Sequence, residues 1–171
     1  MIAPAAPLTL VLGGARSGKS LHAERLVTAL PGPWTYIATA QAFDAEMRAR
    51  ISAHQARRAA GWQTQEAPID VADALARAQD RPVLVDCLTL WLSNLMLGGN
   101  DIAAATSAVE TALDRRAAPC VLVANEVGLG IVPENALARA FRDAAGSLNQ
   151  RLAARAGRVV FMVAGLPMSM K

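Results

Sequence analysis

Five short apolar segments recur along the chain, and segments with helical periodicity lie between them. The apolar segments are Leu8–Leu12, Trp34–Ala38, Val83–Asp86, Val121–Asn125 and Val159–Val163. Four of them are continuously apolar, which is typical of strands buried on both faces. The helical segments are Lys19–Leu30, Asp44–Ala60, Val71–Ala78, Ile102–Ala117 and Ala136–Ala156. This alternation predicts a three-layer α/β fold, in which helices flank both faces of a mostly parallel sheet.

The remaining segments complete this prediction. We interpret 62–66 as a loop, 88–97 as an apolar run and 166–171 as a short mobile tail. Asp101 and Asn135 are predicted helix N-caps, and the helix after Asn135 is expected to pack through Leu137, Phe141 and Leu148. Without a linker or an internal repeat, the chain is predicted to form a single domain over residues 1–171.

The segment Gly13–Ser20, with the sequence GGARSGKS, fits the pattern G-x-x-x-x-G-K-[ST] of a phosphate-binding P-loop. Glycines allow a tight turn whose N–H groups point inward, and the following helix adds its positive end. Lys19 is suited to the β- and γ-phosphates and Ser20 to Mg²⁺. A glycine-rich turn preceding a lysine is the alternative, but the strand before and the helix after favour a P-loop, RecA-like domain that binds a nucleoside triphosphate.

Composition adds few constraints. The net charge of +3 and the pI of about 9.4 suit anionic substrates or nucleic acid without deciding between them. No apolar run is long enough to span a bilayer, and the N-terminus lacks the basic start of a signal peptide. Cys87 and Cys120 have no metal-site spacing and flank apolar segments, as reduced core cysteines do. We therefore expect a cytoplasmic protein.

Asp86 ends the third apolar segment, where a P-loop protein places the aspartate that holds Mg²⁺. The alternative role, an N-cap for the run 88–97, is less favoured once the P-loop is present. Glu66 is suited to a base edge or ribose hydroxyls, or is an exposed loop acid. Asn125 and Glu126, followed by a glycine-broken loop, indicate a substrate-facing segment or only a turn.

The segment 44–58 contains a histidine among arginines. At about 100° per residue, Arg50, His54, Arg57 and Arg58 fall within one arc of the predicted helix. Such a group is commonly a solvated face. The more specific interpretation is a cationic cluster that could hold a triphosphate, in which the neighbouring positive charge would keep the imidazole neutral and nucleophilic.

Together these segments resemble the bifunctional adenosylcobinamide kinase / adenosylcobinamide-phosphate guanylyltransferase family of cobalamin biosynthesis. The resemblance is carried by 13–20, 36–40, 46–58, 86–89, 94–95 and 125–135. It implies phosphorylation of the aminopropanol hydroxyl of adenosylcobinamide by ATP or GTP. It also implies transfer of GMP from GTP to that phosphate, which yields adenosylcobinamide-GDP and pyrophosphate.

The resemblance also implies residue roles. His54 would carry GMP as a covalent phosphoramidate, Lys19 would assist catalysis, Ser20 and Asp86 would bind Mg²⁺, and His22 would be structural. Some relatives have a second histidine where this chain has Ala53. The implied nucleotide-binding residues are Gly13, Gly14, Ala15, Arg16, Ser17, Gly18, Lys19, Ser20, Ala38, Thr39, Ala40, Gln55, Ala56, Arg57, Arg58, Glu66 and Asp86. The family is also expected to form a homo-oligomer, with a trimer as the candidate state and the site near a subunit boundary.

Three other functions are compatible with parts of this sequence. A P-loop kinase of another small alcohol would form no covalent nucleotide intermediate, and a regulatory switch would turn GTP over slowly. A nucleic-acid-binding NTPase would use the arginine-rich helix, but few aromatic residues and no long basic stripe accompany that helix. The resemblance implies a corrinoid partner, and the sequence features predict no nucleic-acid partner.

Overall fold

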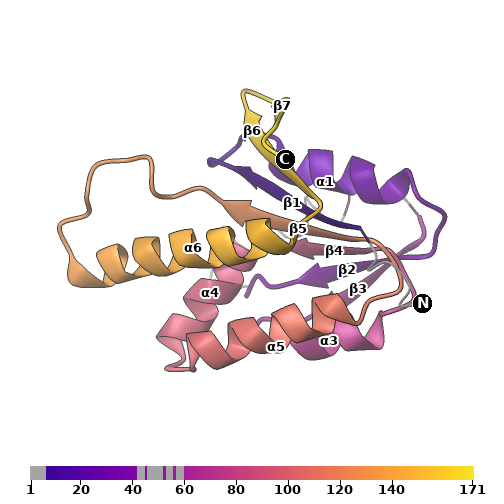
Figure 1. Cartoon of the computed structure of the whole chain (residues 1–171), viewed down its shortest axis with the longest axis horizontal. Coiled ribbons are helices and arrows are strands. Elements are labelled where there is room, and N and C mark those ends of the chain that lie inside the picture. The colour runs from indigo at the N-terminus through magenta and orange to yellow at the C-terminus, as the bar shows by residue number, and fades with distance from the viewer. Residues whose placement is uncertain (1–6, 42–44, 46–51, 53–55, 57–59) are drawn as a thin grey trace.

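Seven strands form one sheet in the computed structural model, which describes residues 7–41, 45, 52, 56 and 60–171 (Figure 1). The strands are β1 (Leu8–Gly13), β2 (Trp34–Ala38), β3 (Trp62–Glu66), β4 (Val83–Asp86), β5 (Cys120–Asn125), β6 (Arg158–Val163) and β7 (Leu166–Ser169). Their order in the sheet is β3-β2-β4-β5-β1-β6-β7. Each neighbouring pair is parallel except β6 and β7. The predicted mostly parallel sheet is confirmed.

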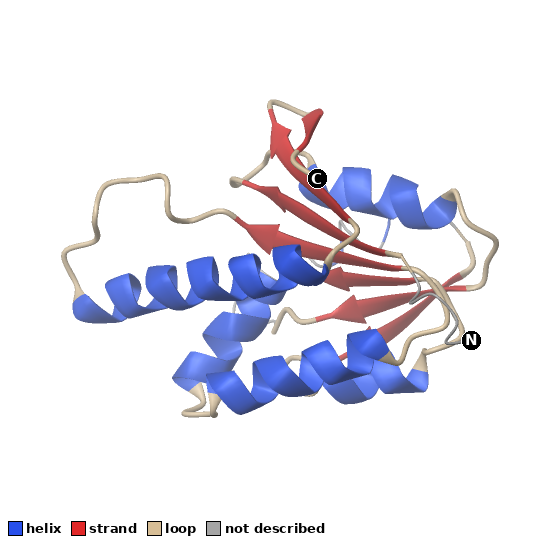
Figure 2. Cartoon of the chain, viewed as in Figure 1, coloured by secondary structure: helices blue, strands red, loops and turns tan. Residues whose placement is uncertain are grey.

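Helices cover both faces of this sheet (Figure 2). The described helices are α1 (Lys19–Thr28), α3 (Val71–Arg77), α4 (Leu88–Leu97), α5 (Ile102–Asp114) and α6 (Ala136–Arg155). Helix α1 packs on one face through Ala23 and Val27. The other four lie on the opposite face, where Trp91 is among the largest fully buried side chains. The predicted three-layer α/β fold is thus observed.

The segment 62–66 is the edge strand β3 rather than the predicted loop. It pairs in parallel with β2, from Trp34 opposite Trp62 to Ala38 opposite Glu66. Gln63 and Thr64 are exposed, so the segment lacks the apolar pattern of a central strand. Trp62 anchors it, because its ring centroid lies 5.6 Å from that of Trp34 and 5.8 Å from that of Tyr36.

The C-terminal segment is also ordered differently from the prediction of a mobile tail. Residues Leu166–Ser169 form β7, which returns antiparallel to β6 after a turn at Ala164 and Gly165. Both turn residues have positive φ, 51° and 78°, as tight hairpins require. All four residues of β7 are exposed, so no hydrophobic pattern identified the strand.

The helix ends test the predicted caps. Asp101 accepts a hydrogen bond from the Ala104 N–H and Asn135 accepts one from Ala138, as predicted. Helix α4 begins after Cys87, so Asp86 is not its N-cap. Phe141 and Leu148 pack on the core, but Leu137 is 58% exposed, because the first turn of α6 extends beyond the sheet (Figure 1).

Candidate functional site

The phosphate loop connects the end of β1 to the start of α1. Gly18, the N-cap of α1, has φ 90°, a left-handed conformation that glycine adopts without strain. A side chain at Gly13 would lie 2.5 Å from Ser17 Oγ and 2.9 Å from the Met162 carbonyl oxygen, so the loop closes over that glycine. The Lys19 ammonium donates to the Gly14 carbonyl at 3.0 Å, which holds its charge on the loop.

The β6–β7 turn supports this loop from the side. The Gly165 N–H donates to the Ser17 carbonyl oxygen at 3.1 Å, and a Cβ at Gly18 would lie 3.3 Å from the Gly165 Cα. The C-terminal hairpin therefore buttresses the phosphate-binding segment. The sequence analysis did not predict this contact, because the contact depends on the turn that precedes β7, and β7 was not predicted as a strand.

Asp86 lies at the carboxyl ends of the parallel strands, which form the same edge of the sheet as the one that carries the phosphate loop. Strand β5 separates β1 from β4, so the carboxyl ends of β1 and β4 are two strand spacings apart, about 10 Å. The Asp86 carboxylate accepts a hydrogen bond from the Tyr36 hydroxyl at 2.9 Å. Tyr36 itself is only 4% exposed, so the carboxylate is held from the side of β2.

Charges near this end of the sheet affect the pKa of the Cys87 thiol. The pKa of this thiol is raised to about 11, mainly by burial and in part by the Asp86 carboxylate. The Lys19 ammonium acts in the opposite direction on that pKa, so the charge on the phosphate loop reaches the end of β4. The loop and the strand therefore contribute to one electrostatic environment.

Thr39 ties the ends of β2 and β4 together. Its side chain is fully buried, and its hydroxyl donates to the Cys87 carbonyl at 2.7 Å and accepts from the Cys87 N–H at 2.8 Å. The Asn94 amide donates to the carbonyls of Thr39 and Pro68. Thr39 thus fixes the position of Asp86 and Cys87, a contribution that the sequence analysis did not anticipate.

Glu66 lies further along the same edge, beside Ala38 in the register of β2 and β3. It is exposed, and four strand spacings, about 19 Å, separate its strand from β1. Of the predicted residues on the following segment, Ala56 is helical and exposed. His54, Gln55, Arg57 and Arg58 lie outside the described residues, as does most of the predicted helix 44–60.

Two buried polar atoms at this edge have no hydrogen-bond partner among the described residues. They are Ser17 Oγ, in the phosphate loop, and Asn125 Oδ1, at the end of β5. Buried polar atoms are normally satisfied, so both are candidates for contact with a ligand. The sequence singled out Asn125 through its place after an apolar segment.

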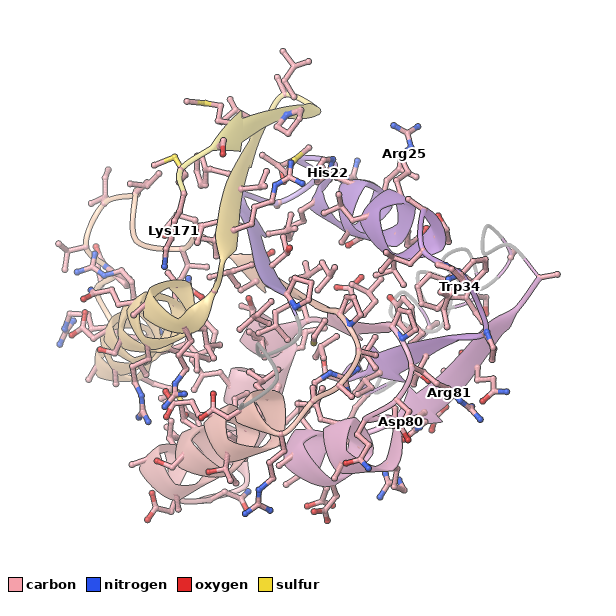
Figure 3. All side chains as sticks on the ribbon, turned by 45° about the vertical axis from the view of Figure 1, so that its right-hand side comes forward. His22, Arg25, Trp34, Asp80, Arg81 and Lys171 are labelled. Atoms are coloured by element: carbon pink, nitrogen blue, oxygen red, sulfur yellow. The ribbon has the colours of Figure 1, made fainter. Side chains whose placement is uncertain are left out.

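His22 lies on α1 with Arg25 (Figure 3). Burial is the main cause that lowers the pKa of its imidazole, and the positive charges of Arg158 and Arg25 lower it further. The ring is consequently neutral near pH 7.

No helix in the described part of the chain is long and apolar enough to cross a membrane.

A phosphate loop, its lysine and an aspartate at one edge of a parallel sheet define a P-loop nucleotide-binding protein. The chain belongs to the family described as cobinamide kinase / cobinamide phosphate guanyltransferase, whose sequence profile matches residues 9–170. The enzyme class predicted from the resemblance is therefore confirmed: this is a bifunctional kinase and guanylyltransferase that acts on cobinamide and its phosphate.

Three curated relatives support this membership. The chain is 48% identical to the bifunctional adenosylcobalamin biosynthesis protein CobP of Pseudomonas aeruginosa, over 95% of this chain and 96% of that protein. It is 45% identical to the bifunctional adenosylcobalamin biosynthesis protein CobU of Salmonella typhimurium and 42% identical to that of Escherichia coli. Each of these two matches covers 96% of this chain and 99% of the relative.

Proposed function

We propose that the phosphate loop and the neighbouring strand ends form the nucleotide site for both reactions, within adenosylcobalamin biosynthesis. ATP or GTP phosphorylates the aminopropanol hydroxyl of adenosylcobinamide, and GTP then supplies GMP to that phosphate. One observation carries this proposal: the phosphate loop, Asp86 and Glu66 lie along one edge of the sheet, within about 19 Å. An extended nucleoside triphosphate can lie along such an edge, with its phosphates at β1 and its ribose and base toward Glu66.

Ser20 and Asp86 are suited to a Mg²⁺ ion that accompanies the nucleotide. The ion prefers oxygen ligands and takes the rest of its coordination from phosphates and water. A hydroxyl in the first turn of α1 and a carboxylate at the end of β4 match that preference. The described residues contain no group of three His, Cys, Asp or Glu side chains that could hold a metal ion on their own. When bound, Mg²⁺ would offset negative charge on the phosphates.

His54 is the residue we propose as the carrier of GMP. The Nε2 or Nδ1 lone pair of the neutral imidazole attacks the α-phosphorus of GTP, and the bond from that phosphorus to the bridging oxygen breaks. Pyrophosphate leaves with the electron pair, while Lys19 and the arginines near His54 stabilise its charge. An oxygen of adenosylcobinamide phosphate then attacks the same phosphorus. The P–N bond breaks, and the imidazole is regenerated.

A labelling experiment tests this role, because the chain has two histidines and the other one lies on α1. GTP labelled at the α-phosphate should mark the wild type and the His22→Ala variant. It should leave the His54→Ala variant unlabelled and unable to transfer GMP. The label should be lost in acid and retained in base. A labelled His54→Ala variant would remove His54 from the mechanism.

We further propose that the enzyme is a cytoplasmic homo-oligomer, with a trimer as the expected state. Two features support this proposal. The segment between β5 and α6 exposes Leu129 and Ile131, which are 82% and 97% exposed, and such apolar surface is common at protein interfaces. Both cysteines are buried free thiols, as in reducing compartments. Sedimentation equilibrium should yield three chains per particle, and a monomer at micromolar concentration would contradict the proposal.

A further inference from the structure

Asn125 ends the strand that lies between the phosphate loop and Asp86. Its backbone is in register with Gly13, the first glycine of the loop. The next residue, Glu126, donates its N–H to the Gly13 carbonyl at 3.1 Å, so the two strand ends are joined at this point. Asn125 therefore lies beside the first glycine of the phosphate loop.

The side chain of Asn125 projects toward the face of the sheet that carries α1. Side chains alternate along a strand, and Val121 and Val123 pack in the cluster beneath α1, whereas Ala124 packs on the other face. Asn125 continues the first series. The phosphate loop crosses to α1 on that same face, and Ser17 Oγ is buried there above Gly13.

Two helices hold the backbone of Asn125 and leave its amide oxygen unused. The Asn125 N–H donates to Thr89 Oγ1 of α4 at 2.6 Å, and Asn149 of α6 donates to the Asn125 carbonyl at 3.3 Å. Thr89 and Asn149 are themselves buried. Asn125 Oδ1 is buried without a partner among the described residues, which is unfavourable for a polar atom. A fixed backbone with an unsatisfied amide oxygen is the arrangement of a ligand contact.

The missing partner must be a hydrogen-bond donor. Phosphate oxygens of a bound nucleotide accept rather than donate. The Lys19 ammonium, which donates to the Gly14 carbonyl, is already assigned to those phosphates in the proposed site. The acceptor substrate of the kinase reaction is an alcohol, whose hydroxyl carries one proton to donate. Glu126 is not an equivalent candidate, because its carboxylate accepts from the Gly128 N–H of its own turn.

We propose that the Asn125 amide oxygen accepts a hydrogen bond from the cobinamide hydroxyl and orients it for phosphorylation, an inference that rests on the proposed function. The hydroxyl oxygen forms a bond to the γ-phosphorus, and the bond from that phosphorus to the β–γ bridging oxygen breaks. The nucleoside diphosphate leaves with the electron pair, and the hydroxyl proton passes to water. An amide cannot remove that proton, so Asn125 acts by orientation alone.

This role separates the two activities of the enzyme. Guanylyl transfer begins at a histidine, and its second acceptor is a phosphate that presents oxygen acceptors. Loss of the Asn125 amide should therefore slow phosphorylation of the alcohol and spare GMP transfer. It should slow nucleotide hydrolysis less, because water is small, carries two protons and can reach the γ-phosphorus in more than one orientation.

The test measures how the γ-phosphoryl group partitions between adenosylcobinamide and water. Wild type, Asn125→Leu and Asn125→Asp are incubated with ATP and adenosylcobinamide, and phosphorylated corrinoid and free phosphate are quantified by mass analysis and a phosphate assay. The ratio does not depend on the folded fraction of a variant, because the same sites make both products. Asn100→Ala, at an exposed position just after α4, is the matched asparagine control.

The ratio of ester to free phosphate should fall about 10- to 100-fold in Asn125→Leu and less in Asn125→Asp, which keeps an acceptor oxygen. Guanylylation by labelled GTP should stay within about threefold of wild type. An unchanged ratio, or loss of phosphorylation, hydrolysis and guanylylation together, would overturn the inference. Failure of the wild type to form the phosphate ester would instead overturn the proposed function.

Discussion

The Tyr36 hydroxyl donates a hydrogen bond to Oδ2 of Asp86 at 2.9 Å, across two neighbouring parallel strands whose residues are 50 positions apart. The ring of Tyr36 is fixed by an edge-on contact with Trp62, at a centroid distance of 5.8 Å. The Tyr36 hydroxyl thereby fixes the orientation of one carboxylate oxygen of Asp86. We infer that this bond sets the direction in which Asp86 presents its charge toward the nucleotide site.

Replacement of Tyr36 by phenylalanine should weaken the metal dependence of the enzyme without unfolding it. The ring and its contact with Trp62 remain, and one hydrogen bond to a charged group is lost, about 1.5–3 kcal/mol. We expect the Mg²⁺ concentration at half-maximal activity to rise severalfold, with Mn²⁺ binding measured by EPR weakened in parallel. Nucleotide affinity without metal should not change. A Tyr36→Phe variant with the wild-type metal requirement would show that the bond does not orient Asp86.

Lys19→Ala should depress both reactions, because one phosphate loop serves both nucleotides in the proposed site. The lost ammonium is the group that would neutralise the β- and γ-phosphates, so affinity for labelled ATP and GTP should fall about tenfold or more. Arg25→Ala is the matched control, since Arg25 lies on the same helix but in its last turn (Figure 3). Equal nucleotide affinity in wild type and Lys19→Ala would contradict the placement of the triphosphate on this loop.

The sequence predicted the central strands and the phosphate loop because their signals are local. Strands β1, β4 and β5 are buried on both faces and are continuously apolar, and the loop has a fixed spacing of glycine and lysine. Strand β3 was not predicted because every residue in it after Trp62 is polar. Strand β7 escaped because each of its residues is exposed and its formation depends on two residues with positive φ at the preceding turn.

The contacts that build the site could not be predicted in the same way. The bonds from Tyr36 to Asp86 and from Thr39 to Cys87 exist because β2 lies beside β4. Strand order is a property of the whole sheet, and no local pattern in the chain encodes it. The same holds for Asn125, whose place beside Gly13 follows from β5 lying between β1 and β4.

Glu110 should make stability depend on pH in the acidic range. Hydrogen bonds from Arg151 are the main cause that lowers the pKa of its carboxyl below the usual 4.5, and they join α5 to α6. A carboxyl with a depressed pKa stabilises the fold above its unfolded pKa and loses that contribution as the pH falls through the folded value. Glu110→Gln should therefore be less stable than wild type to urea at pH 7, and the difference should shrink steadily below about pH 4.5.

The matched control for Glu110 is Asp114→Asn, one helical turn along α5. Asp114 pairs with Arg155 at 2.7 Å, but its side chain is 60% exposed, so the pair should contribute little. We expect the urea midpoint of Asp114→Asn to lie close to that of the wild type both at pH 7 and below about pH 4.5. A Glu110→Gln variant that matches Asp114→Asn at pH 7 would show that the bonds between Glu110 and Arg151 do not stabilise the contact between α5 and α6.

Arg116 should be a residue on which folding depends and catalysis does not. It is only 4% exposed, and its guanidinium donates to the carbonyls of Leu75, Ala78 and Arg81, at the end of α3. Burial lowers the pKa of Arg116, but the planar fork of donors still satisfies three carbonyls at once. The three carbonyls precede β4 and Arg116 precedes β5, so they lie at the amino ends of the strands, opposite the nucleotide site.

Arg116→Met keeps much of the apolar stem of the side chain and leaves those carbonyls without their donor. We expect the free energy of unfolding in urea to fall by about 2–4 kcal/mol. Arg116→Lys should recover only part of this loss, because a single ammonium cannot reach three carbonyls in the same geometry. The turnover number of the folded fraction should equal that of the wild type in both variants. Equal stability of Arg116→Met and wild type would mean that the guanidinium bonds only offset the cost of burying its charge.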